Sequence, residues 1–139
     1  MPSSNSLPLV LIVDESTEDI FSVRRGLEKA GVKNPVVTFS DAEPVVSFLR
    51  ATSVRNTCEP SLKPAAVFID AKLPRRSFAR ILDWMVEASA MEKILVVVTA
   101  RDPEDRSRAK GWSVKHFTSK SPTKADLSAI TSHIALRAR

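Results

Sequence analysis

The stretch AAVFIDAKLP, Ala65–Pro74, decides the fold that this sequence predicts. It opens with five mostly apolar residues, Ala65–Ile69, which lead straight to a single carboxylate, Asp70. An apolar run of this length predicts a strand that is buried on both faces, as in a parallel sheet. Asp70 would then lie at the carboxyl edge of the sheet, where open α/β sheets bind their ligands.

Two other apolar runs also end in polar residues. Residues 9–13, LVLIV, lead to Asp14 and Glu15, and residues 94–98, ILVVV, lead to Thr99. Because the carboxyl ends of parallel strands share one edge of a sheet, we expect these polar side chains to converge with Asp70.

The rest of the chain alternates strands with helices. Two further strands are expected at residues 36–39 and 114–118. Helices are expected at residues 17–30, after the cap Ser40 or Asp41, at 77–90, from Asp102 to Gly111, and after the cap Thr123. This alternation predicts a doubly wound α/β fold, with a five-stranded parallel sheet in the order 2-1-3-4-5 and helices on both faces.

The composition is that of an ordinary globular domain. The chain has 139 residues, 43% hydrophobic and 27% charged, and we expect one domain over 1–139 with a flexible lead at 1–7 and a surface loop at 51–63. The apolar runs are far shorter than the roughly 20 residues of a membrane span, and the N-terminus does not resemble a signal peptide. The single cysteine, Cys58, cannot form an internal disulfide, which suits the cytoplasm.

The net charge is +5, from 21 basic and 16 acidic side chains. The basic residues are spread along the chain and alternate with acids, which is typical of a solvated surface. We therefore expect no direct binding to nucleic acid and none to a membrane.

The converging side chains suggest phosphoryl chemistry. Acids at one strand edge repel one another unless a cation lies between them, and a few oxygen ligands suit Mg²⁺ or Mn²⁺. Asp70 could attack a phosphoryl group to give an aspartyl phosphate. The hydroxyl of Thr99 and the ammonium of Lys120, which follows the last strand, could stabilise the transferring oxygens.

These residues resemble the motifs of response-regulator receiver domains: Asp14-Glu15, Asp70 with Pro74 four residues later, Thr99-Ala100, and Lys120. The resemblance spans nearly the whole chain, and residues 13–41, VDESTEDIFSVRRGLEKAGVKNPVVTFSD, are most similar to single-domain regulators of the phytochrome-associated type. Chemotaxis regulators share the same motifs. The resemblance implies the flavodoxin-like receiver fold.

The resemblance also implies roles for individual residues. Asp70 would accept a phosphoryl group from a histidine kinase or a phosphotransfer protein, and Thr99 and Lys120 would bind that group. A divalent cation would be held by Asp14, Glu15, Asp70 and the backbone carbonyl of Lys72. Thr99 and Phe117 would form the conformational switch, and Lys72 and Arg101 would tune the lifetime of the phosphoryl group.

The sequence departs from the family pattern at several positions, of which Lys72, Glu15 and Ser77-Phe78 keep a second hypothesis open. Glu15 stands where an aspartate is usual, Ser77-Phe78 replaces Asp-Gly, and Ser121 replaces the proline after Lys120. A cis bond before Ser121 would cost about 3–4 kcal/mol. The alternative is a degenerate receiver that binds partners without phosphorylation.

Two other expectations concern nearby residues. Lys72 lies two residues after Asp70, so strand alternation would place its ammonium beside the acids, where it would weaken the binding of Mg²⁺. Lys72 also stands where a phosphatase of the haloacid-dehalogenase type needs a second acid, which argues against that enzyme class. His116 and His133 have no evident metal-ligand partners in the sequence.

The resulting hypothesis is a stand-alone response regulator with no output domain, which is not a turnover enzyme. Its output would be a protein partner, bound through the last strand and the last two helices, with a homodimer as a further possibility. Phosphorylation would act by shifting two pre-existing states of that surface.

Overall fold

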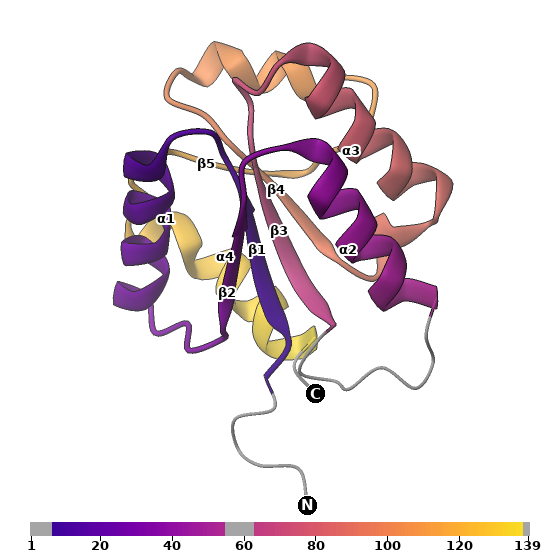
Figure 1. The fold of residues 1–139 in the computed structure, drawn as a ribbon. Helices are drawn as coiled ribbons and strands as arrows, with labels where there is room; N and C mark the ends of the chain where they lie inside the picture. The colour runs from indigo at the N-terminus through magenta and orange to yellow at the C-terminus, as the bar shows by residue number, and fades with distance from the viewer. Residues whose placement is uncertain (1–6, 55–62, 138–139) are drawn as a thin grey trace, which may run out of the picture.

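The computed structural model describes residues 7–54 and 63–137, which form one five-stranded parallel sheet in the order β2-β1-β3-β4-β5 (Figure 1). The strands are β1 (Leu9–Val13), β2 (Val36–Phe39), β3 (Pro64–Asp70), β4 (Leu95–Thr99) and β5 (His116–Thr118). The helices are α1 (Thr17–Lys29), α2 (Ala42–Val54), α3 (Arg75–Glu87) and α4 (Lys124–Arg137), with two 3₁₀ segments, η2 (Ala90–Glu92) and η3 (Pro103–Ala109). The predicted fold class and strand order are confirmed.

The sheet separates two hydrophobic cores. In Figure 1, α1 and α4 lie on one face of the sheet, and α2 and α3 lie on the other. Side chains of the central strands alternate between them: Val10 and Ile12 pack toward α1 and α4, whereas Leu11 and Val13 pack toward α2 and α3. This explains why β1, β3 and β4 are continuous apolar runs, since both faces of each strand are covered.

Local signals fix the start and end of the outer helices. The Ser16 hydroxyl accepts a hydrogen bond from the Asp19 amide at 3.2 Å, as the capping pattern predicts. After α1, Gly31 adopts a left-handed φ of 88°. At the start of α4, the Asp126 amide donates to the Thr123 hydroxyl at 3.1 Å, and the Thr123 amide donates to Asp126 Oδ2 at 3.0 Å.

Several predicted boundaries were wrong. The loop predicted at 51–63 begins later, because α2 continues to Val54, where the Thr52 hydroxyl donates to the Phe48 and Leu49 carbonyls within the helix. The helix predicted at 77–90 is α3, which begins at Arg75 and ends at Glu87. The chain then turns through Ser89 at φ 54° into η2. The lead at 1–6 and the loop residues 55–62, with Cys58, lie outside the described residues.

The segment predicted as a helix from Asp102 is a 3₁₀ helix, and the Asp102 side chain makes no capping hydrogen bond. Only Asp105 and Ala109 of this segment are buried, so it lacks the apolar stripe that stabilises an α-helix against a sheet. The strand predicted at 114–118 is paired only over His116–Thr118. Among the described residues, no helix is long and apolar enough to cross a membrane.

Gly26 lies in the middle of α1, against the loop that carries Lys120. A Cβ atom at Gly26 would lie 2.6 Å from the Pro122 carbonyl oxygen and 2.8 Å from its Cγ. The backbone of α1 therefore approaches this loop as closely as a glycine allows. The contact holds the loop after β5 against α1.

We expect Gly26→Ala to lower the free energy of unfolding by about 1–3 kcal/mol, because the added methyl group must push the loop away. At a helical position with open space around it, Gly→Ala would instead raise the free energy of unfolding by about 1 kcal/mol. A decrease at Gly26 would therefore be evidence for its contact with the Pro122 loop. Chemical denaturation measures both proteins, with Ser132→Ala on the exposed surface of α4 as the control. Equal or higher stability of Gly26→Ala would contradict the contact.

Candidate functional site

Three of the predicted site residues lie at the carboxyl edge of the sheet. Asp14 follows β1, Asp70 ends β3 and Thr99 ends β4, and each is at most 6% exposed. Asp70 and Thr99 are direct neighbours in the parallel register of β3 and β4. The convergence that the apolar runs predicted is therefore present in the structure.

Lys120 joins these residues across the sheet edge. Its Nζ donates to Asp14 Oδ2 at 2.5 Å and to Asp70 Oδ1 at 2.7 Å, and the lysine itself is 6% exposed. Two buried carboxylates this close would repel each other strongly without a shared cation. The ammonium of Lys120 supplies that cation.

Backbone amides fix the orientation of both carboxylates. The Lys72 amide donates to Asp70 Oδ1 at 2.9 Å, and the Ser16 amide donates to Asp14 Oδ1 at 2.9 Å. Each bond spans two residues, so the turn after each strand is shaped by the acid that ends it. Asp70 Oδ2 accepts no hydrogen bond from the described residues and is not among their buried unpaired atoms.

Asp19 belongs to the site although it was not predicted to. Its Oδ1 accepts a hydrogen bond from Arg101 at 2.6 Å, and its Oδ2 lies 3.7 Å from Lys120 Nζ. The sequence carried a signal for it, since Asp19 lies in the first turn of the helix that directly follows Asp14 and Glu15. An acid at this position also interacts favourably with the helix dipole, so its place in the sequence does not by itself assign it to the site.

The Lys72 ammonium does not lie beside Asp70, contrary to the prediction. Its Nζ lies 3.6 Å from Asp105 Oδ1 of η3, and its side chain is 55% exposed. The prediction was wrong because β3 ends at Asp70, and strand alternation does not continue into the turn that holds Lys72. Besides Lys120, the cation near the acids is the Arg101 guanidinium, which pairs with Asp19.

The other predicted residues lie at the margin of the site. Glu15 is exposed, and Phe117 is half-buried against the core under α3, with the Arg106 guanidinium 5.5 Å from its ring centre. Phe78, where the family has a glycine, is fully buried and packs edge-on against Trp112 at 5.8 Å. The described residues contain no cis peptide bond.

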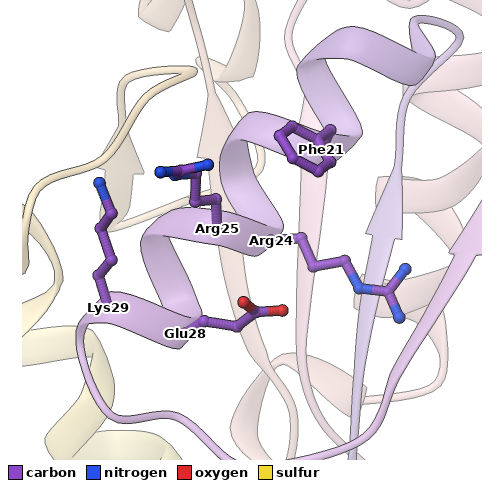
Figure 2. Close-up of a pocket in the computed structure, with 5 residues that line it drawn as sticks. All are labelled: Phe21, Arg24, Arg25, Glu28 and Lys29. Carbon is purple, nitrogen blue, oxygen red and sulfur yellow. The ribbon is translucent and has the colours of Figure 1, made fainter.

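The outer face of α1 carries a separate group of side chains, which Figure 2 shows. Phe21 is 62% exposed and shares a shallow pocket with four charged residues, Arg24, Arg25, Glu28 and Lys29 (Figure 2). A single exposed aromatic side chain is ordinary on a protein surface. The exposure of Phe21 alone therefore does not indicate a binding site.

A divalent cation suits only part of this site as it stands. Among the described residues, no group of three or more His, Cys, Asp or Glu side chains is arranged to hold a metal ion. Asp14 and Asp70 offer the oxygen ligands that Mg²⁺ prefers, but Lys120 Nζ lies between them and Glu15 is exposed. These two carboxylates, with the Lys72 carbonyl, remain the residues that would hold the ion.

Solved structures of response regulators match nearly the whole chain. The bacteriophytochrome response regulator AtBRR has a TM-score of 0.74 at 24% identity, covering 93% of each chain. A two-component response regulator from Legionella pneumophila has a TM-score of 0.71 at 16% identity, covering 93% of this chain and 98% of its own. This chain has the receiver-domain fold.

The phosphorylated cyanobacterial phytochrome response regulator RcpA shares the receiver fold, with a TM-score of 0.63 at 21% identity and coverage of 92% of this chain and 91% of its own. No protein-family model matches the chain, and no curated protein does. The resemblance seen in the sequence is thus confirmed for the fold.

The charge state of Asp14 gives a test of the carboxylate cluster. Burial raises the pKa of the Asp14 carboxyl above its ordinary value of 3.8, and the nearby Asp70 charge raises it too. The hydrogen bonds from Lys120 and from the Ser16 amide oppose that rise. A proton on Asp14 therefore favours the folded chain, and stability is lost as the pH rises through the folded-state pKa.

We expect Asp14→Asn to raise the free energy of unfolding at pH 7, by about 1.4 kcal/mol for each unit of that pKa difference. The gain should vanish below the unfolded pKa, where wild-type Asp14 is protonated in both states. Urea unfolding of wild type and Asp14→Asn at several pH values measures this gain in the free energy of unfolding. Asp102→Asn, at an exposed position, is the control. A gain that does not depend on pH would contradict this account.

Proposed function

We propose that this protein is a response regulator whose receiver fold accepts a phosphoryl group on Asp70. The observation that carries the proposal is the state of the Asp70 carboxylate. Its Oδ1 is held by Lys120 and by the Lys72 amide, whereas Oδ2 accepts no hydrogen bond from the residues that the structure describes. One oxygen is thus fixed and the other is available as a nucleophile.

In the proposed reaction, Asp70 Oδ2 attacks the phosphorus of a phosphohistidine on a kinase or phosphotransfer protein. The new O–P bond forms as the N–P bond breaks, and its electron pair returns to the donor imidazole. The Lys120 ammonium contacts Asp70, and Thr99 is the register partner of Asp70 on β4, which supports a role for both in stabilising the phosphoryl oxygens. A divalent cation on Asp14 and Asp70 would neutralise further charge there.

Phosphorylation would then change the contacts of Lys120, because a phosphoryl oxygen competes with Asp14 and Asp70 for its ammonium. Lys120 follows β5, so the change would pass to β5, η3 and α4, the surface proposed to bind the output partner. Thr99 and Phe117 are the proposed switch residues, and such a device shifts two pre-existing states. We place the protein and its kinase in the cytoplasm.

The degenerate receiver is the second candidate, and one observation favours it. The carboxylates already have internal counter-ions, Lys120 for Asp14 and Asp70 and Arg101 for Asp19. A site neutralised in this way could stay folded and bind partners with neither metal nor phosphate. The two candidates differ in whether Asp70 reacts.

We expect wild-type protein incubated with acetyl phosphate and Mg²⁺ to gain the mass of one phosphoryl group. Asp70→Asn should gain none, since an amide does not attack phosphorus, while Asp83→Asn, a matched change outside the site, should behave as wild type. Intact mass spectrometry decides the outcome. Unmodified wild type, under conditions that label an ordinary receiver, would support the degenerate candidate.

Metal binding is tested separately. If Asp14 holds the ion, Mg²⁺ should raise the melting temperature of wild type but not of Asp14→Asn, because an ion that binds only the folded state stabilises it. Glu15→Gln tests the predicted role of Glu15, and a lost response there would show that its exposed side chain turns inward to bind. An unchanged response in Asp14→Asn would rule out Asp14 as a ligand.

A further inference from the structure

The two histidines of the chain meet at the edge of the sheet. His116 lies on β5 and His133 on α4, and their ring centroids are 5.1 Å apart with an angle of 66° between the ring planes. This pairing could not be predicted from the amino-acid sequence, because it depends on how α4 crosses β5. Each histidine therefore has a second imidazole beside it.

The separation of the rings is that of two imidazoles sharing one metal ion. Zinc lies about 2.0–2.1 Å from a ligating imidazole nitrogen, which places it about 3.2 Å from each ring centroid, and a tetrahedral angle then separates the centroids by about 5.2 Å. The observed 5.1 Å meets this requirement. The separation of the rings therefore permits one ion to contact both imidazoles when a nitrogen of each faces it.

The surroundings admit an ion from solvent. His116 is half-buried, His133 is exposed, and both line one open pocket together with Glu92 and Lys115. Glu92 lines the same pocket, and Lys115 adds a positive charge that weakens the binding of any cation. Since no three candidate ligands of the described residues are arranged as a metal centre, water must complete the coordination.

We propose that His116 and His133 form a binding site for a late first-row divalent metal ion of the Zn²⁺ class. Imidazole nitrogens favour such ions, whereas the carboxylate oxygens of Asp14 and Asp70 favour Mg²⁺. The two sites therefore select different metals. An ion on the histidines would fasten α4 to the edge strand β5 and leave open positions for a ligand from a partner.

The test is a titration of the full chain with Zn²⁺ in the presence of saturating Mg²⁺. Calorimetry should show one ion per chain with a Kd on the order of 10 μM, since two imidazoles are half of a structural zinc set. His133→Gln and His116→Gln should each weaken binding at least tenfold. Because the chain has only two histidines, their ring signals in NMR spectra are readily assigned, and Zn²⁺ should shift both.

Two controls separate this site from other ligands. Cys58→Ser removes the only thiol of the chain, and Asp14→Asn removes a carboxylate of the other site, and both should keep the zinc affinity. His133 is exposed, so His133→Gln should fold, which its melting temperature checks. Binding weaker than about 1 mM, or binding that survives both histidine variants, would overturn the proposal.

Discussion

The structure depends on one buried ammonium group. Lys120 reaches Asp14 and Asp70 from the loop after β5, so its side chain must cross the end of β4, where the chain has the short residues Thr99 and Ala100. Without that cation, two adjacent strands would end in carboxylates that repel each other in a poorly hydrated place, a cost of several kcal/mol. The strand order brings the carboxylates of Asp14 and Asp70 together, and the Lys120 ammonium offsets the repulsion between them.

Two weaker ion pairs extend this arrangement outward. Arg101 ties the loop after β4 to Asp19 of α1, and Lys72 ties the turn after β3 to Asp105 of η3. Both cations are more than half exposed, so each pair contributes no more than about 1 kcal/mol. Their effect is positional, since they join the first turn of α1 and the polar segment η3 to the loops that flank Asp70.

The sequence predicted the elements correctly wherever their hydrophobic residues follow a regular pattern. Continuous apolar runs located β1, β3 and β4, and shared strand ends then brought Asp14, Asp70 and Thr99 together. Prediction failed where no regular pattern continues. The side chain of Lys72 was misplaced because this residue lies in a turn beyond its strand, and η3 was predicted as an α-helix although it has no apolar stripe. Prediction also missed the meeting of His116 with His133, since that pairing depends on how α4 packs across β5.

The charge of the cluster bears on when a divalent cation is needed. The cluster contains three acidic side chains and two basic ones, so its net charge is one negative charge. Its members are Asp14, Asp19, Asp70, Lys120 and Arg101. A phosphoryl group on Asp70 would replace one negative charge by nearly two, as on a phosphorylated side chain. A divalent cation would then bring the cluster close to neutral. In this arrangement the internal cations offset most of the negative charge of the resting cluster, and a phosphoryl group on Asp70 would leave more negative charge for a divalent cation to offset.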